Sequence, residues 1–81
     1  MSRAGTDELY LRDLGLLLKE RALEARSDRD AAKGSDRSAY AEGRLMGLYE
    51  VISLMQQQAT AFGLEASDLN LHDLDPERDL L

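Results

Sequence analysis

The sequence predicts an all-α protein in which two long helices form an antiparallel hairpin, followed by a short C-terminal extension. Apolar residues recur every three or four positions through two long stretches, as they do along one face of a helix. A polar stretch containing Gly34 separates these stretches, and Gly63 follows the second one. We therefore expect a hairpin over 1–63, with helices at about 6–33 and 36–62, and an extension over 64–81.

The first helix is expected to begin at Thr6, whose hydroxyl can cap it. Asp7 and Glu8 follow in the first turn, where carboxylates favour the helix dipole. Its main apolar positions have helical spacing: Leu11, Leu14, Leu18, Ala22 and Ala25. The polar residues 27–38 then form a solvated tip, in which Gly34 ends the helix.

The second helix is expected to start after Ser35 or Asp36, either of which can cap it. Its main apolar stripe consists of Tyr40, Ala41, Leu45, Leu48, Val51, Ile52, Met55, Ala59 and Phe62. Gly63 ends the helix, and Leu64 after it suits the hydrophobic contact of a Schellman motif.

Antiparallel pairing about Gly34 places residue i of the first helix near residue 68 − i of the second. This register puts Glu24 opposite Arg44, which lies within the apolar stripe and needs a partner. It also predicts the pairs Ala25 with Gly43, Arg21 with Gly47, and Leu14 with Leu54.

Each helix carries a second line of apolar or small residues that a lone hairpin cannot bury. These lines are Leu9, Leu16 and Leu23 on the first helix, and Ala39, Gly43, Gly47 and Leu54 on the second. A glycine inside a helix costs about 1 kcal/mol relative to alanine, so Gly43 and Gly47 indicate close approach of another helix. We expect a homodimer, a four-helix bundle with one of these lines at its interface. The alternative is that the glycines accommodate Tyr10 or Leu23 inside the same hairpin.

The extension is strongly acidic, with six carboxylates against the single Arg78. Its first part, residues 64–74, is expected to pack on the hairpin through Leu64, Leu69, Leu71 and Leu74. Asp75 and Pro76 have the pattern of a cap and a first helical residue, which predicts one last helical turn. The final residues, 76–81, are expected to be mobile and to offer Leu80 and Leu81 to a partner.

The composition argues against catalysis, metal binding and cofactor binding. Cysteine is absent and His72 is the only histidine, so zinc, haem and di-iron ligand sets have no candidates. The helix carboxylates Glu20, Glu24, Glu42 and Glu50 lack the Glu-x-x-His pattern of a di-metal bundle. No base lies near a nucleophile in the sequence, so we expect a protein that is not an enzyme.

The expected function is protein–protein interaction, as an adaptor, regulator or inhibitor. No apolar run approaches the roughly 18 residues of a membrane span, and the N-terminus lacks a signal-peptide pattern, which predicts a cytoplasmic protein. The alternative is RNA or DNA binding through Arg21, Arg26, Arg29, Lys33 and Arg37, which the net charge of −6 disfavours. In shape alone, the expected architecture resembles small plasmid-type RNA-binding proteins in which two helical hairpins dimerise.

Overall fold

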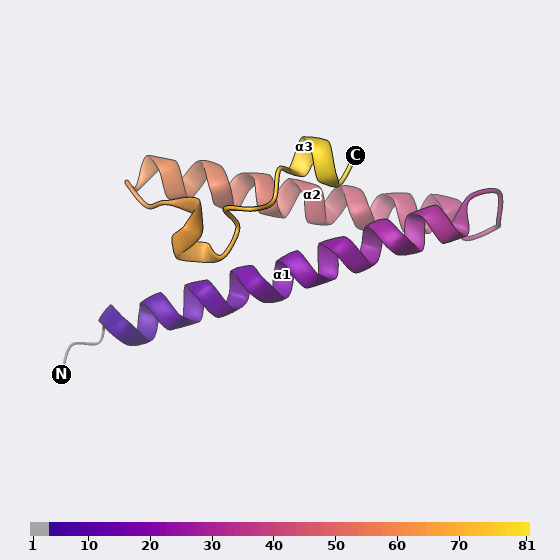
Figure 1. Cartoon of the computed structure of the whole chain (residues 1–81). Coiled ribbons are helices and arrows are strands. Elements are labelled where there is room, and N and C mark those ends of the chain that lie inside the picture. The colour runs from indigo at the N-terminus through magenta and orange to yellow at the C-terminus, as the bar shows by residue number, and fades with distance from the viewer. Residues whose placement is uncertain (1–3) are drawn as a thin grey trace.

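The computed structural model describes residues 4–81, and within that range the chain is entirely helical apart from turns and connections. Helix α1 (Ala4–Ala32) and helix α2 (Ser38–Ala61) form an antiparallel hairpin (Figure 1). A 3₁₀ turn, η1 (Ala66–Leu69), and a short helix, α3 (Pro76–Asp79), follow in the extension. The predicted all-α hairpin with a C-terminal extension is confirmed. We expected no signal peptide at the N-terminus, and residues 1–3 of that segment lie outside the described range.

The hairpin turn depends on a backbone conformation that glycine adopts without strain. Gly34 has φ +78°, and the amide of Ser35 donates to the carbonyl of Ala32 at 3.0 Å. Ser35 shapes this turn rather than capping α2: its hydroxyl donates to Ala32 O and accepts from the Arg37 amide. Arg37 occupies the cap position of α2 and makes no side-chain capping bond. The expected cap at Thr6 is also wrong, because α1 already includes Ala4 and Thr6 lies inside it.

Helix α2 ends in the predicted Schellman motif. Gly63 has φ +75°, its amide donates to Thr60 O, and the Leu64 amide donates to Ala59 O at 2.7 Å. This reversal sends the chain back along the hairpin. We call this end of the molecule, where α1 begins and α2 ends, the open end, and the 33–37 turn the tip.

The predicted pairing of Glu24 with Arg44 is confirmed by an ion pair. Arg44 Nη2 lies 2.9 Å from Glu24 Oε1, and its Nη1 lies 3.1 Å from Asp28 Oδ2 one turn further along α1. The predicted contacts of Ala25 with Gly43 and of Arg21 with Gly47 are wrong, because both glycines point away from α1 and a Cβ on either would meet nothing within 4 Å.

Three small residues, Ala22, Ala25 and Ala41, are buried in the half of the hairpin nearer the tip. The two helices lie close together there and diverge toward the open end, where η1 lies between them (Figure 1).

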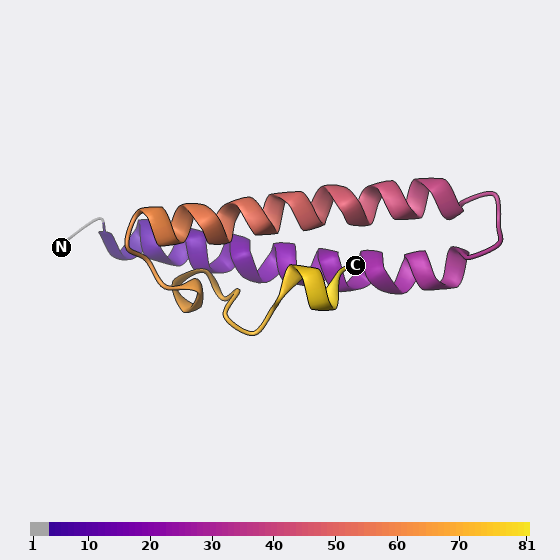
Figure 2. The same ribbon diagram turned by 90° about the horizontal axis from the view of Figure 1, so that it is seen from above.

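The extension runs back along one side of the hairpin (Figure 2) and completes the core. Buried residues from all three segments form one cluster: Ala22, Ala25, Leu45, Ile52, Ala59, Leu69, Leu71, Leu74 and Leu80. The predicted packing of residues 64–74 is confirmed for three of its four leucines. Leu64, the fourth, remains 41% exposed.

Polar contacts from both long helices hold the extension in place. The Gln56 amide of α2 donates to the carbonyls of Leu71 and Leu74, at 3.2 and 2.9 Å. From α1, Lys19 pairs with Asp73 at 3.1 Å. Two further bonds to α1 join the Asn70 side-chain amide to Arg12 O and the Arg26 guanidinium to Asp79 O, each 3.0 Å.

The last six residues correct our expectation of a mobile end. Asp75 does cap α3, accepting from the amides of Glu77 and Arg78, and Pro76 holds the first helical position as predicted. Pro76 and Leu80, however, are buried, and Leu80 is fully enclosed in the core. Leu80 is therefore not free to reach a partner, whereas Leu81 is 55% exposed. The Asp75 cap and the bond from the Leu80 amide to Pro76 O, 2.9 Å, form this last turn, and the burial of Leu80 in the core anchors it.

Close backbone approach occurs at Gly15, a position that the glycine pattern did not single out. A Cβ at Gly15 would overlap the main-chain carbonyl of Leu69 in η1. A Cβ at Gly43 or Gly47 would meet nothing within 4 Å. The alternative that these two glycines make room for Tyr10 or Leu23 inside the hairpin is therefore wrong. Their contact with a second chain stays a prediction.

Candidate interaction surface

Large apolar side chains remain exposed after the hairpin and the extension have packed. They are Leu9, Tyr10, Leu17, Leu23, Tyr40, Met46, Val51, Leu54, Phe62, Leu64 and Leu81. Tyr40, Val51 and Phe62 were expected in the main apolar stripe of the second helix. Of that stripe, Ala41, Leu45, Ile52 and Ala59 are the residues that are buried.

The extension covers one side of the hairpin, and no element of residues 4–81 lies on the other side (Figures 1 and 2). On α1, Lys19 points to the covered side, since it binds Asp73. Glu24, about 140° further round the helix, reaches Arg44 along the uncovered side. Residues seven and fourteen positions before Glu24 share its face, and these are Leu17 and Tyr10.

The uncovered side presents alternating spacings of four and three residues on both helices. On α1 the positions are Tyr10, Leu14, Leu17, Arg21, Glu24 and Asp28. On α2 they are Arg44, Leu48, Val51, Met55, Gln58 and Phe62. We call these twelve residues the seam face, because this spacing is that of the contact seam of a coiled coil.

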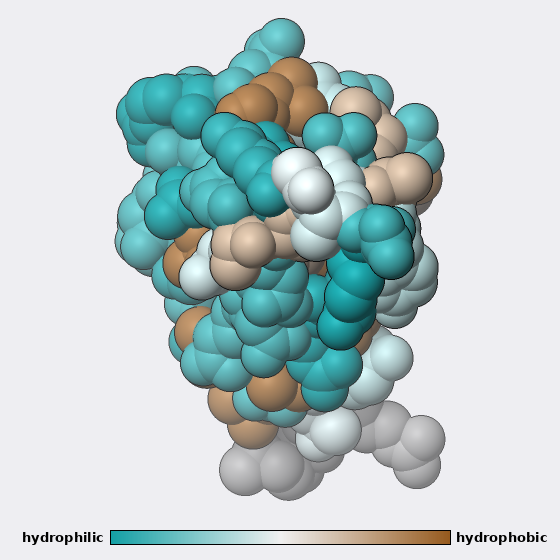
Figure 3. All heavy atoms as spheres, turned by 90° about the vertical axis from the view of Figure 1, so that its right-hand side faces the viewer, coloured by the Kyte–Doolittle hydropathy of each residue, from teal (hydrophilic) through white to brown (hydrophobic). Residues whose placement is uncertain are grey.

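The seam face is apolar toward the open end and charged toward the tip. Tyr10, Leu17, Val51 and Phe62 are 44–75% exposed, and Leu14, Leu48 and Met55 are half-buried between the helices. Nearer the tip, Arg44 lies between two carboxylates of α1. Its hydrogen bond to Glu24 is the main cause that raises the pKa of Arg44 above its usual value. Hydrophilic residues dominate the view onto the tip (Figure 3).

An apolar groove of about 340 Å³ opens near the open end, where the two helices diverge. It is lined by Leu11, Met55, Gln58, Ala59, Phe62, Leu64 and Leu69. Three of these residues, Met55, Gln58 and Phe62, belong to the seam face. The groove is therefore continuous with the seam, and the extension contributes Leu64 and Leu69 to it.

The two predicted interface lines lie on different sides of the molecule. Leu16 and Leu23 follow Arg12 and Lys19 by one helical turn, so their line borders the extension. Leu9 on that line is 66% exposed and Leu23 is 37% exposed.

On α2, Ala39, Gly43, Gly47 and Leu54 are all exposed. Gly47 and Leu54 border the seam face, since each lies three positions from Val51 or Arg44. The structure thus does not bring the two lines together, and participation of either in a dimer stays a prediction.

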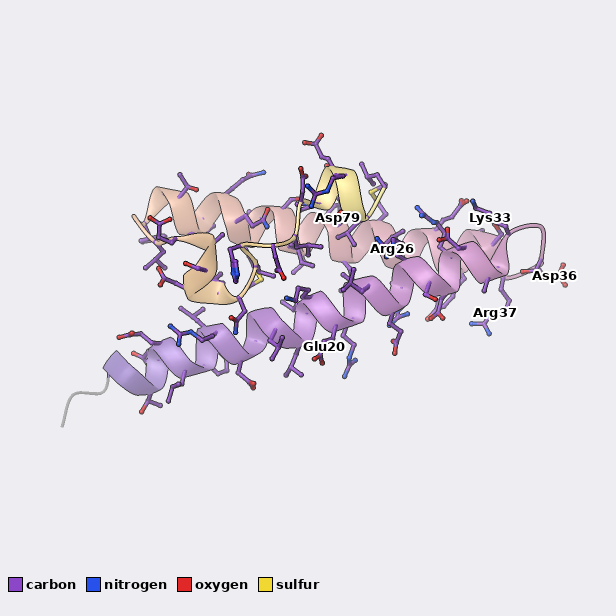
Figure 4. All side chains as sticks on the ribbon, in the orientation of Figure 1. Glu20, Arg26, Lys33, Asp36, Arg37 and Asp79 are labelled. Atoms are coloured by element: carbon purple, nitrogen blue, oxygen red, sulfur yellow. The ribbon has the colours of Figure 1, made fainter. Side chains whose placement is uncertain are left out.

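The basic residues expected in the nucleic-acid alternative do not share one face. Arg26 rises from α1 toward Asp79 of the extension (Figure 4), whereas Arg29 and Lys33 both pair with Asp30 near the tip. The Arg37 guanidinium lies over the ring of Tyr40, 5.9 Å from its centre. Arg21, on the seam face, is about 140° round the helix from Arg26.

Within residues 4–81, no group of three or more histidine, cysteine, aspartate or glutamate side chains is placed to hold a metal ion. Over the same range, no helix combines the length and the apolar character needed to cross a bilayer. Comparison with protein-family models, with curated proteins and with solved structures found no match.

The 4–3 spacing of the seam face is visible in the sequence, but apolar periodicity alone does not identify it. Five of its twelve positions are polar or charged, so it does not stand out as an apolar stripe. Leu9, Leu16 and Leu23 form a line without a polar residue, and Gly43 and Gly47 indicate a different face of α2. The position of the extension is what distinguishes the covered side from the uncovered one.

Proposed function

We propose that this protein is a small interaction module that works as a helical homodimer and acts as an adaptor, regulator or inhibitor of another protein. The observation that supports this proposal is the seam face, a coiled-coil pattern on two adjacent helices that the chain's own extension leaves uncovered. Helices with apolar residues on two sides are stabilised when both sides are buried.

Burial of the exposed seam residues provides the driving force for association. Complete burial of one large apolar side chain is worth about 1.5–3 kcal/mol. In a symmetric dimer each exposed residue counts twice, so Tyr10, Leu17, Val51 and Phe62 supply eight side chains, each of which gains part of this energy because it is 44–75% exposed. This gain opposes the loss of translational and rotational freedom on association.

A dimer formed through the seam face leaves a second apolar surface for the protein that the module acts on. Leu9 and Leu23 lie on the other side of α1 and remain exposed. Leu81 is exposed at the C-terminus. One surface for self-association and another for a partner is the arrangement that an adaptor or an inhibitor requires.

Sedimentation equilibrium between about 1 and 100 μM protein tests the homodimer. We expect a mass twice that of the 9.0 kDa chain over most of this range. A micromolar dissociation constant corresponds to about −8 kcal/mol. A single species of one chain at about 10 μM would contradict the proposal.

A further inference from the structure

We propose that the seam face is occupied by a second copy of this chain, with both hairpin tips at the same end and Tyr10 of each copy in the apolar groove of the other. This inference rests on the proposed homodimer and specifies its interface and its orientation. It places the interface on the Tyr10, Leu17 and Val51 side of the hairpin, which Gly47 and Leu54 border and which the line of Leu9, Leu16 and Leu23 does not reach.

The spacing on the seam face points to helices as the occupant. Alternating steps of four and three residues place side chains in a straight row that fits between the side chains of a facing helix. Both α1 and α2 carry six such positions, and the rows run side by side. A surface built from two parallel rows matches another pair of antiparallel helices, which is what a second hairpin offers.

The polarity of the seam face selects the orientation of the two copies. Its apolar residues lie toward the open end, and Glu24, Asp28 and Arg44 lie toward the tip. With tips at the same end, apolar residues meet apolar residues and the charged groups meet near the solvated tip. With tips at opposite ends, Tyr10 and Phe62 would cover the charged groups, whose removal from water is costly.

The same-end arrangement also pairs specific residues. A twofold axis parallel to the hairpin places α1 of one copy beside α2 of the other, at the register seen within the hairpin. Leu17 then faces the partner's Val51, and Arg21 faces the partner's Gly47, where the missing Cβ leaves room for the long side chain. Tyr10 falls at the level of the partner's Gln58, which lines the groove.

Charge and area are both compatible with this arrangement. Glu24 of one copy lies level with the partner's Arg44, and Asp28 lies one turn nearer the tip, so each arginine gains a further carboxylate and like charges are not brought face to face. The face that spans residues 10–28 and 44–62 is roughly 27 Å long and roughly 20 Å wide. Side chains project from this face, so its accessible surface is larger than its flat outline. The accessible area is of the order of the ~800 Å² that each partner buries in a standard interface.

A matched pair of substitutions on one helix tests which face is used. Leu17→Arg places a charge on the seam face, and Leu23→Arg places the same charge about 120° away, beside the extension. Both leucines are partly exposed, so both variants are expected to fold. We expect Leu17→Arg to raise the dimer dissociation constant by about 30-fold or more, as a substitution at an interface hot spot does. Leu23→Arg should change it less than about threefold.

Val51→Arg repeats the test on α2, and circular dichroism verifies that each variant remains helical. Dissociation by Leu17→Arg and Val51→Arg supports the inference. If Leu23→Arg dissociates the dimer while Leu17→Arg does not, the seam face is not the interface, although the homodimer itself stands. A wild-type monomer in sedimentation overturns the proposed function as well.

The orientation can be measured because the natural chain contains no cysteine. Asp36→Cys introduces one labelling site at each tip, and a spin label there reports the distance between the two tips. The molecule is 53 Å long. Tips at the same end should give a label separation of roughly 20–25 Å, given helices about 10 Å apart. A separation above roughly 40 Å would overturn the same-end arrangement while leaving the choice of face to the arginine variants.

Tyr10→Ala tests the proposed anchor. We expect it to weaken the dimer by at least about tenfold, because an aromatic side chain that fills a partner's pocket dominates such interfaces. Leu9→Ala is the matched control, since Leu9 is similarly exposed (66% against 67%) but lies about 100° from Tyr10 around α1, outside the seam face. Equal effects of the two substitutions would contradict the insertion of Tyr10.

Discussion

Single residues show why glycines in one helical protein differ in importance. Gly34 and Gly63 adopt positive φ in the two chain reversals, where a side chain would be strained. Gly15 lies within α1 against the carbonyl of Leu69, so it permits the close approach of η1. Gly43 also lies within a helix but has open space beside it. A substitution to alanine should therefore have opposite effects at positions 15 and 43.

We expect Gly43→Ala to stabilise the folded monomer by about 1 kcal/mol, the gain in helix propensity. Gly15→Ala has the same gain, but its Cβ forces the main chain of η1 to move, and overpacking of this kind costs about 1–3 kcal/mol. The free energy of unfolding, measured by urea titration at low protein concentration, separates the two. If Gly15→Ala were as stable as Gly43→Ala, η1 would not pack on α1 as described.

Leu80 and Leu81 are neighbours in the chain with opposite environments. Leu80 is fully buried, whereas Leu81 is 55% exposed. We expect Leu80→Ala to lower the free energy of unfolding by about 2–5 kcal/mol, as for other buried leucines. Leu81→Ala should change it by less than about 0.5 kcal/mol, as most surface substitutions do. Similar thermal denaturation of both variants would indicate that the end of the chain is free after all.

At the scale of elements, the extension depends on polar contacts as well as on its leucines. Lys19 beside Asp73 lowers the pKa of that carboxyl group through a side-chain hydrogen bond. Within α3, Arg78 and then the Asp75 amide lower the pKa of Asp79 to about 2. Asp79 Oδ2 accepts the Asp75 amide at 2.9 Å, which closes the turn before α3.

These depressed pKa values predict loss of stability in acid. A carboxyl group whose pKa is lower in the folded state stabilises the fold above its unfolded pKa, about 3.9 for aspartate. That contribution disappears as the pH falls from about 4 toward 2. Asp79→Asn should be less stable than wild type at pH 7 and should lose less stability on acidification.

Urea titrations at pH 7, 4 and 2.5 measure this difference. Asp36→Asn at the exposed tip is the control, and it should follow the wild-type pH profile. A wild-type profile for Asp79→Asn would mean that the turn at α3 does not depend on the ionised carboxylate.

At the scale of the whole molecule, the hairpin is long and thin, 53 × 21 × 16 Å. A shape of this kind has a large surface relative to its core, and chains of this length often gain stability from assembly. The extension adds a third segment to the core on one side only. The uncovered side is therefore where a second chain would add most to stability.

The proposed dimer predicts that thermal stability depends on protein concentration. Association that involves only the folded state raises the melting temperature as the concentration increases. We expect the melting temperature of the wild type to rise by several degrees between about 2 and 200 μM. The melting temperature of Leu17→Arg should be nearly constant over this range. A constant melting temperature for the wild type would contradict assembly through any face.

The sequence by itself determined the two helices, their glycine-directed ends and their register. These features depend on residues close together in the chain: apolar spacing specifies a helix, and a short turn fixes which residues of two antiparallel helices are level. Glu24 and Arg44 could be paired for that reason. The Asp75–Pro76 start of α3 was predictable on the same local grounds.

Only the tertiary structure decided which side of the hairpin the extension covers. That choice depends on contacts between distant parts of the chain: Gly15 against Leu69, Gln56 with Leu71 and Leu74, and Leu80 in the core. Several lines of leucines are equally spaced in the sequence, so the sequence does not show which of them is covered. They become distinct in the folded chain, where the extension packs beside one line and leaves the others exposed. The candidate interaction surface is the side that remains uncovered, so it could not be located until the path of the extension was known.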